Sequence, residues 1–226
     1  MTIDLHHDDA FMLLSNMADK SVDITFTSPP FNRKRNDKYA NYNDVIDDYF
    51  GWVERLINEC VKKTKRHVIV NLQTNYYNRT DVYKIIGRFA EKIQNIIVWE
   101  KSNPLPASGN NLTNAYELFL IIGDSSIKSN TTYTKNHITT SVNSQSTTKI
   151  HKAVMKQEVA DWFIEKFTDA QDIVFDPLMG LGTTGVSCKK YGRNFIGCEI
   201  DEQYYKIAQE RIYARQTESQ MERRSQ

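Results

Sequence analysis

The sequence predicts an α/β fold, in which a mostly parallel sheet is covered by helices on both faces. Short, β-branched apolar runs alternate along the chain with longer segments whose apolar residues recur at helical spacing. A glycine-rich turn follows one of the late apolar runs, at residues 176–185. With 226 residues, 40% of them hydrophobic, the chain is long enough to bury one full core.

The first half of the chain, residues 1–124, begins with a short helix that Asp8 or Asp9 caps and that ends near Met17. A strand is predicted over Val22–Thr27, because β-branched and aromatic residues there alternate with polar ones. The elements that follow are predicted as a helix over Asp44–Lys63, a strand over His67–Leu72, a helix over Thr80–Glu91, and strands over Asn95–Trp99 and Tyr116–Ile122. Two prolines and a glycine make residues 101–112 a loop.

The second half, residues 151–214, continues the alternation. Its predicted elements are a helix over Lys156–Phe167, a strand over Asp172–Phe175, a helix over Thr183–Tyr191, a strand over Asn194–Cys198 and a helix over Glu202–Ile212. The tail, residues 215–226, is rich in Gln, Ser and Arg, and we expect it to be flexible.

Between the two halves lies a polar segment, residues 125–157, that contains no acidic residue. Such a composition fits either a disordered linker or a surface that orders against a polyanion. Because the flanking segments resemble two halves of one sheet, we interpret residues 125–150 as a small insert that recognises DNA. Its basic candidates for contact are Lys128, Lys135 and Lys149.

Charge and cysteine content exclude several other classes of protein. The formal net charge of +1 gives no global signature of nucleic-acid binding, so any basic surface must be local. Cys60, Cys188 and Cys198 are widely spaced, which argues against disulfides and a zinc site and favours the reducing cytoplasm. No metal site, signal peptide or membrane-spanning run is predicted.

The most unusual local feature is the stretch Thr27-Ser28-Pro29-Pro30-Phe31, which closes the first predicted strand. Prolines have no N–H donor and a fixed φ, so the carbonyls of Ser28 and Pro29 remain as acceptors with little freedom to move. These carbonyls and the Ser28 hydroxyl can accept hydrogen bonds from a planar amino group, and the Phe31 ring can stack on the ring that carries it. The exocyclic amine of cytosine or adenine fits this description. An ordinary surface turn is the alternative.

A polar segment, residues 32–43, follows this turn. It is either a solvated loop or, beside a pocket, a flap that grips phosphate. Its basic candidates lie among tyrosines and are Arg33, Lys34, Arg35 and Lys38.

The glycine-rich turn at residues 176–185 joins a strand to the start of a helix. Gly180 and Gly182 allow a ligand to approach the backbone, and a helix N-terminus favours negative charge. Glu199 ends the next strand, where an acid accepts hydrogen bonds from ribose hydroxyls. The pattern therefore predicts an adenosine-bearing ligand, with NAD as one candidate and a plain tight turn as the alternative. No Gly-Lys-Ser/Thr is present, which excludes a Walker phosphate loop.

In this order the two motifs resemble those of the DNA amino-methyltransferases, in the permuted arrangement called the β class. There a Ser/Asp-Pro-Pro-Tyr/Phe motif comes first, a target-recognition insert follows, and the S-adenosylmethionine motif comes last. Asp176–Thr184 matches the family's Asp-Pro-Phe-x-Gly-x-Gly-Thr-Thr pattern, with Leu178 in place of Phe. Further similar segments are Asp8–Ala10, Ile97–Lys101 and Asn114–Glu117.

The resemblance implies a Rossmann-like methyltransferase sheet and S-adenosylmethionine as the cofactor. The catalytic residues that it implies are Ser28, Pro29, Pro30 and Phe31. The cofactor-binding residues that it implies are Asp9, Asp176, Leu178, Gly180, Gly182, Thr183, Thr184, Glu199 and Ile200.

The implied reaction is methylation of the exocyclic amine of a base flipped out of double-stranded DNA. Serine at the first motif position leans toward cytosine N4 in the family, and adenine N6 is the alternative. Methylation of RNA or of a protein amide, and a catalytically inactive DNA-binding relative, stay open. A homodimer, a cognate restriction endonuclease and a bacterial or phage origin are further expectations from the family.

Overall fold

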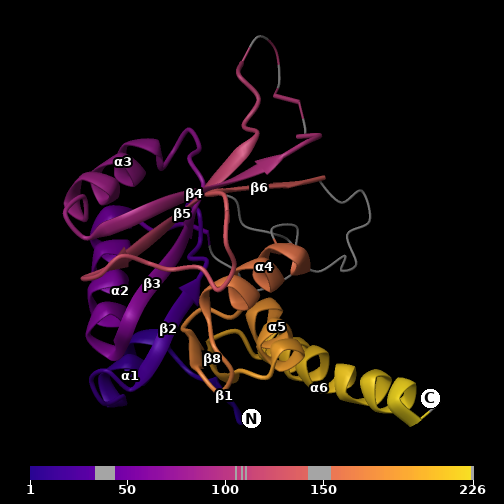
Figure 1. Cartoon of the computed structure of the whole chain (residues 1–226). Helices are drawn as coiled ribbons and strands as arrows, with labels where there is room; N and C mark the ends of the chain where they lie inside the picture. The colour runs from indigo at the N-terminus through magenta and orange to yellow at the C-terminus, as the bar shows by residue number, and fades with distance from the viewer. Residues whose placement is uncertain (34–43, 105, 108, 110, 142–153, 225–226) are drawn as a thin grey trace.

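The computed structural model describes residues 1–33, 44–104, 106–107, 109, 111–141 and 154–224, with side chains up to Ala214 in the last helix. Figure 1 shows one sheet with helices packed on both of its faces. Its strands are β1 Ile3–His7, β2 Val22–Thr27, β3 Thr64–Leu72, β4 Ile93–Lys101, β5 Tyr116–Gly123, β6 His137–Thr140, β7 Ile173–Asp176 and β8 Asn194–Glu199. Its helices are α1 Ala10–Asn16, α2 Tyr49–Lys63, α3 Arg79–Arg88, α4 Gln157–Phe167, α5 Thr183–Tyr191 and α6 Glu202–Arg224.

The strand order is β1-β8-β7-β2-β3-β5-β4-β6. All neighbours pair in parallel except β5, which runs antiparallel to both β3 and β4. The predicted α/β architecture with a mostly parallel sheet is thus confirmed. The carboxyl ends of β2, β3, β7 and β8 consequently lie at one edge of the sheet, where α/β proteins bind ligands.

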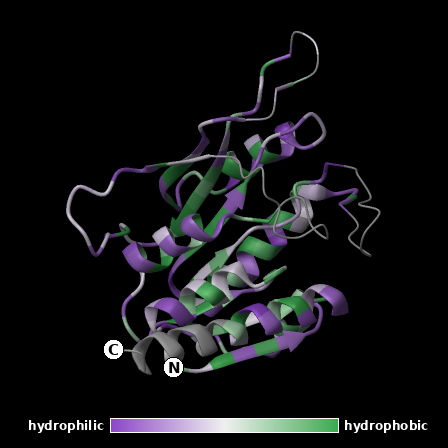
Figure 2. Ribbon diagram, turned by 90° about the vertical axis from the view of Figure 1, so that its right-hand side faces the viewer, coloured by the Kyte–Doolittle hydropathy of each residue, from purple (hydrophilic) through white to green (hydrophobic). Residues whose placement is uncertain are grey.

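Two apolar layers bury the two faces of the sheet. On one face α1, α2 and α3 pack against side chains such as Val22, Val68 and Leu120. On the other, α4, α5 and α6 pack against Ile24, Phe26 and their neighbours. Figure 2 shows apolar residues along the strands and on the helix surfaces turned toward them. Val22 faces the opposite layer from Ile24 and Phe26, although these residues are two apart, because the register between β2 and β3 shifts between Val22 and Ile24.

Two strands differ from the predictions. β1, Ile3–His7, has a largely polar sequence that does not predict a strand, yet it pairs in parallel with β8 at the edge of the sheet. β6, His137–Thr140, lies inside the predicted DNA-recognition insert but extends the main sheet beside β4. Its Ile138 is buried, and Thr140 Oγ1 accepts a hydrogen bond of 2.9 Å from Trp99 Nε1. Strand pairing, rather than the local sequence, determines both elements.

The helices begin and end near their predicted positions, with two shifts. α2 begins at Tyr49 rather than at Asp44, because the side chain of Asp48 caps it by accepting a 2.9 Å hydrogen bond from the Gly51 amide. α6 begins at Glu202 as predicted and continues to Arg224, past the predicted end at Ile212.

Candidate active site

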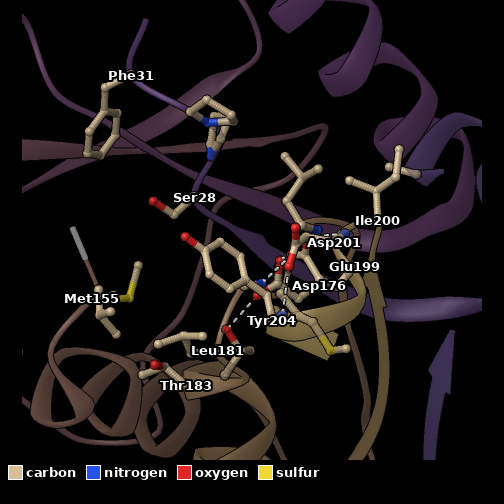
Figure 3. Close-up of a pocket in the computed structure, with 18 of the residues that line it drawn as sticks. Ser28, Phe31, Met155, Asp176, Leu181, Thr183, Glu199, Ile200, Asp201 and Tyr204 are labelled. Atoms are coloured by element: carbon tan, nitrogen blue, oxygen red, sulfur yellow. Dashed lines mark hydrogen bonds between the residues drawn. The ribbon is translucent and has the colours of Figure 1, made fainter. Parts of the chain in front are cut away.

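A cavity of about 400 Å³ opens at the carboxyl edge of the sheet, beside the ends of β2, β7 and β8 (Figure 3). A volume of this size lies within the range that small-molecule sites occupy. The cavity is lined by most of the residues singled out from the sequence, namely Asp9, Ser28, Pro29, Pro30, Phe31, Asp176, Leu178, Gly180, Thr183, Thr184, Glu199 and Ile200. Two motifs that lie about 150 residues apart in the chain therefore share one space, as the parallel order β8-β7-β2 dictates.

The glycine-rich turn shapes one side of the cavity. Gly180 has a φ of +51°, and a Cβ at this position would meet no protein atom within 4 Å, so the space beside it is free for a ligand. Gly182 has a φ of +77° but does not line the cavity. A Cβ there would lie 3.0 Å from Ala208 Cβ, so Gly182 allows α6 to pack closely against the turn.

Asp176, the last residue of β7, is buried at the base of the cavity. Its Oδ2 accepts a 2.7 Å hydrogen bond from the Thr184 hydroxyl, and its Oδ1 accepts one of 3.2 Å from the Leu178 amide. Burial outweighs these hydrogen bonds and raises the pKa of Asp176 to about 6. A carboxyl group in this environment changes its charge just below neutral pH.

Glu199, the last residue of β8, faces Asp176 across the turn. Its Oε2 accepts a 2.9 Å hydrogen bond from the Gly180 amide, and its Oε1 accepts one of 2.9 Å from the Asp201 amide. Burial raises the pKa of Glu199, and the charge of Asp201 contributes in the same direction. The backbone thus fixes both carboxylate oxygens at the edge of the cavity, each with capacity to accept a further hydrogen bond.

Asp9 and Ile200 lie where the first strand and the Glu199 segment meet. Asp9 Oδ1 caps α1 by accepting hydrogen bonds of 2.8 Å and 3.1 Å from the amides of Phe11 and Met12. Ile200 is 65% exposed, an apolar side chain at the rim of the cavity. An apolar face beside a carboxylate fits the flat ring and the amino group of adenine.

On the opposite side of the cavity lies the Ser-Pro-Pro-Phe turn. The Ser28 hydroxyl donates a 2.9 Å hydrogen bond to Asn71 Oδ1 on β3. The Phe31 carbonyl accepts hydrogen bonds of 2.7 Å from Asn75 Nδ2 and of 2.7 Å from Asn78 Nδ2 in the loop after β3. These asparagines add a second constraint to that of the prolines, so the turn is held at both ends.

The Phe31 ring is largely buried, with 7% of its surface exposed. The guanidinium of Arg33 lies 5.3 Å from the ring centroid and donates a hydrogen bond to the Gln73 side chain. The Arg33 amide also donates a 2.8 Å hydrogen bond to Asp44 Oδ2. Arg33, predicted as a DNA contact, therefore lies against the predicted stacking ring.

Two lysines of the predicted insert, Lys128 and Lys135, do not line this cavity. Lys128 and Lys135 are exposed in the segment that leads from β5 to the first residue of β6, at the amino edge of the sheet. The Asn130 amide between them donates a 2.7 Å hydrogen bond to the Lys166 carbonyl, near the end of α4. Lys128 and Lys135 therefore lie at the edge of the sheet opposite the cavity, and their contact with DNA stays a prediction. The other predicted DNA contacts, Lys34, Arg35, Lys38 and Lys149, lie outside the described residues.

Several residues at the cavity were not predicted as site residues. Figure 3 shows the Tyr204 ring inside the cavity, with its hydroxyl on the side of Ser28. Trp52 packs edge to face against Phe11, and both residues line the cavity. The remaining lining residues are Ala10, Ile46, Val154, Met155, Met179, Leu181 and Asp201. Only the neighbours of the two motifs, such as Asp201, could have been found from sequence spacing.

Fold and cavity together define a class of protein, an α/β enzyme that holds an adenosine-bearing cofactor beside a pocket lined with hydrogen-bond acceptors. Comparison with known families agrees, because residues 22–210 match the model of the N6 and N4 DNA methylases. The chain therefore belongs to that family of DNA amino-methyltransferases. The predicted family is thus confirmed.

Two curated relatives match over most of their length. The chain is 26% identical to the Type II methyltransferase M2.DpnII of Streptococcus pneumoniae, over 93% of this chain and 89% of that protein. It is 27% identical to M2.LlaDCHI of Lactococcus lactis subsp. cremoris, over 92% and 88% respectively. Among solved structures, PvuII DNA methyltransferase, described as cytosine-N4-specific, superposes with a TM-score of 0.78 at 19% identity, covering 93% of this chain and 86% of that one. The last similarity supports the fold.

The family uses S-adenosylmethionine, and the residues at this site suit that cofactor. A complex of M1.HpyAVI with this molecule matches with a TM-score of 0.70 at 23% identity, over 94% of this chain and all of that one. In this chain the open space at Gly180 and the two carboxylates, Asp176 and Glu199, suit ribose hydroxyls and a cationic ligand. In the part of the chain that the structure describes, no helix is long and apolar enough to span a membrane.

Proposed function

We propose that this chain transfers a methyl group from S-adenosylmethionine to the exocyclic amine of a base flipped out of duplex DNA, with cytosine N4 as the preferred target. One observation carries the proposal: the turn Ser28–Phe31 lines the same cavity as Gly180 and Glu199. A target amine on one side and the cofactor on the other can then meet without either having to leave its site.

On the base side, the chain supplies acceptors. The Pro29 carbonyl and the Ser28 oxygen accept hydrogen bonds from the two N–H groups of the amine, which orients the nitrogen lone pair away from them. As the nitrogen gains positive charge in the transition state, these partial negative charges stabilise it more than they stabilise the neutral amine. The bound cofactor supplies an electrophilic methyl group, so no covalent nucleophile of the protein is required.

On the cofactor side, the carboxylates of Glu199 and Asp176 line the cavity, and backbone amides hold them in place. Glu199 accepts hydrogen bonds from the ribose hydroxyls, and Asp9 approaches the adenine amine beside the apolar Ile200 side chain. Asp176, buried beneath the turn, contributes negative charge toward the cationic cofactor when it is ionised.

DNA reaches the cavity from the carboxyl edge of the sheet. The loop whose asparagines hold Phe31 also presents Tyr76 and Tyr77, which are 80% and 55% exposed and contact each other edge to face. Arg79 lies over the Tyr76 ring at 5.9 Å. Exposed aromatic rings beside an arginine suit both stacking on bases and contact with phosphate.

The preference for cytosine rests on Ser28, the neutral residue at the first motif position. The test is mass spectrometry of nucleosides from duplex DNA treated with the purified protein and S-adenosylmethionine. We expect 4-methylcytosine. Only 6-methyladenine would overturn the choice of base, and no methylated nucleoside on any DNA would overturn the proposed activity.

The relatives named Type II methyltransferases favour a role beside a restriction endonuclease in the bacterial cytoplasm. Methylome sequencing of a host that expresses this chain would reveal its recognition sequence. Resistance of that DNA to an endonuclease encoded beside the gene would support the partnership, and full cleavage of methylated DNA would contradict it. Sedimentation of the purified protein tests the expected homodimer.

A further inference from the structure

Asn71 links the Ser28 turn to the neighbouring strands. It lies near the end of β3, with only 1% of its surface exposed. Its Oδ1 lies 2.9 Å from Ser28 Oγ, and its Nδ2 lies 3.3 Å from the Leu118 carbonyl oxygen on β5. The Asn71 side chain thus connects β5, on one side of β3, to the Ser28 turn that follows β2 on the other side.

These two contacts fix which way the amide points. If the amide were turned over, Oδ1 would face the Leu118 carbonyl, and two acceptors would meet without a proton in a buried place. Nδ2 must therefore face Leu118, and Oδ1 must face Ser28. Because a carbonyl oxygen only accepts, the proton in the contact with Ser28 has to come from the serine hydroxyl.

We propose that Asn71 is a positioning residue, which takes the single proton of the Ser28 hydroxyl in a hydrogen bond so that Ser28 Oγ offers only lone pairs to the target amine. The proposal rests on the function proposed above. Without Asn71 the hydroxyl rotates, and in some rotamers its proton points toward the N–H groups of the amine, where it opposes binding.

With its proton bound to Asn71, the neutral Ser28 hydroxyl can only accept hydrogen bonds from the target amine. An ionised aspartate at the same position would have only acceptor oxygens and would need no such partner. Asn71 itself does not ionise, so it orients the hydroxyl and takes no part in moving protons. Its effect should therefore act through Ser28 and should leave the cofactor side of the cavity unchanged.

The test is a double-mutant cycle measured by single-turnover methylation at saturating DNA and cofactor. Asn71→Leu, similar in volume, should slow methyl transfer about 10-fold, since one oriented hydrogen bond in the transition state is lost. In the Ser28→Ala background the same substitution should change nothing further, because its target is already absent. Effects that multiply in the double variant would overturn the proposal and indicate a merely structural role.

The variant Asn71→Asp distinguishes the loss of the hydrogen bond from a loss of packing in the leucine variant. An ionised aspartate still accepts the Ser28 proton, so this variant should be faster than Asn71→Leu at high pH and should slow as the carboxyl takes up a proton. Equal rates for the two variants at every pH would overturn the proposal. Asn130→Leu, which removes a 2.8 Å hydrogen bond to the Thr168 carbonyl at the amino edge, is the matched control and should methylate at the wild-type rate.

The cycle also separates this inference from the proposed function. If Ser28→Ala alone methylates at the wild-type rate, the assignment of the base pocket fails. If Ser28→Ala is slow while Asn71→Leu is normal, only the role of Asn71 fails. Calorimetry with S-adenosylmethionine should give unchanged affinity for both variants, which shows that the cofactor side is intact.

Discussion

The two sides of the cavity differ in charge. The base side consists of neutral acceptors, namely the Ser28 hydroxyl, which is bonded to Asn71, and the carbonyls of the proline turn. Asn75 and Asn78 hold the end of that turn through the Phe31 carbonyl. The cofactor side carries two carboxyl groups, Asp176 and Glu199, with raised pKa values. A neutral amine that becomes positive during reaction needs preorganised partial charges, whereas a cofactor that is already cationic can be met with full ones. Substitutions on the two sides should therefore affect different measured quantities.

The largest expected effect is on the base side. Ser28→Ala should lower the single-turnover methylation rate about 100-fold or more, as loss of a preorganised transition-state contact does in other enzymes. The affinity for S-adenosylmethionine, measured by calorimetry, should stay unchanged. A wild-type rate, or weaker cofactor binding, would contradict the division between the two sides.

The next largest effect is expected on the cofactor side. Glu199→Gln should raise the cofactor Kd about 30-fold, because hydrogen bonds to a charged group are worth roughly 1.5–3 kcal/mol. The rate at saturating cofactor should fall much less. Glu202→Gln, an exposed acid three residues away that pairs with Lys206, is the matched control. Equal loss of affinity in both variants would point to a general charge effect.

A smaller effect is expected for DNA binding at the carboxyl edge. Replacing Tyr76 and Tyr77 together by alanine should weaken duplex binding about 10-fold, since each stacked base contributes roughly 1–3 kcal/mol and one face of the Tyr76 ring already contacts Arg79. Tyr133→Ala at the amino edge, where the ring is fully exposed, should have no effect in the same fluorescence-anisotropy titration. The reverse pattern would place the DNA at Lys128 and Lys135.

The smallest effect is a pH dependence that belongs to the cofactor side. Asp176 has a pKa of about 6 when folded, above its ordinary value of 3.8. Cofactor affinity should therefore weaken several-fold as the pH falls from 7.5 to 5, because a protonated Asp176 must lose its proton on binding. Calorimetry in buffers of different ionisation enthalpy should show that proton release. Affinity that stays constant over this range would contradict the charged role of Asp176.

For the cofactor-free protein, the free energy of unfolding depends on pH in the opposite direction to the cofactor affinity. Since the folded pKa of Asp176 is raised, the folded state binds its proton more tightly than the unfolded state does between about pH 4 and 6. The contribution of this group to the free energy of unfolding therefore falls as the pH rises through that window. Thermal melts of the cofactor-free protein should show that the Asp176→Asn variant lacks this part of the pH dependence.

Much of the fold and of the cavity follows from local sequence. Ser28–Phe31 and Asp176–Thr184 could be predicted because prolines and glycines restrict or free the backbone within a few residues. The polar strand β1 and the strand β6 could not, because pairing with β8 and β4 decides their conformation.

The proposed role of Asn71, which depends on contacts between strands, could not be predicted from the sequence either. Asn71 gains its place only because β3 lies beside β2 and β5, and nothing in its neighbours along the chain marks it. Composition predicts Lys128 and Lys135 as DNA contacts, and the path of the chain from β5 to β6 places them at the edge of the sheet opposite the cavity. Composition predicts the kind of surface, and topology decides where it lies.

The most direct test of the account is a crystal structure of the protein with a non-reactive cofactor analogue and duplex DNA. We expect one base flipped into the cavity, with its exocyclic nitrogen about 3 Å from both Ser28 Oγ and the Pro29 carbonyl oxygen, and with the analogue against Gly180 and Glu199. A base that stays stacked while DNA lies along the Lys128 and Lys135 edge would contradict it.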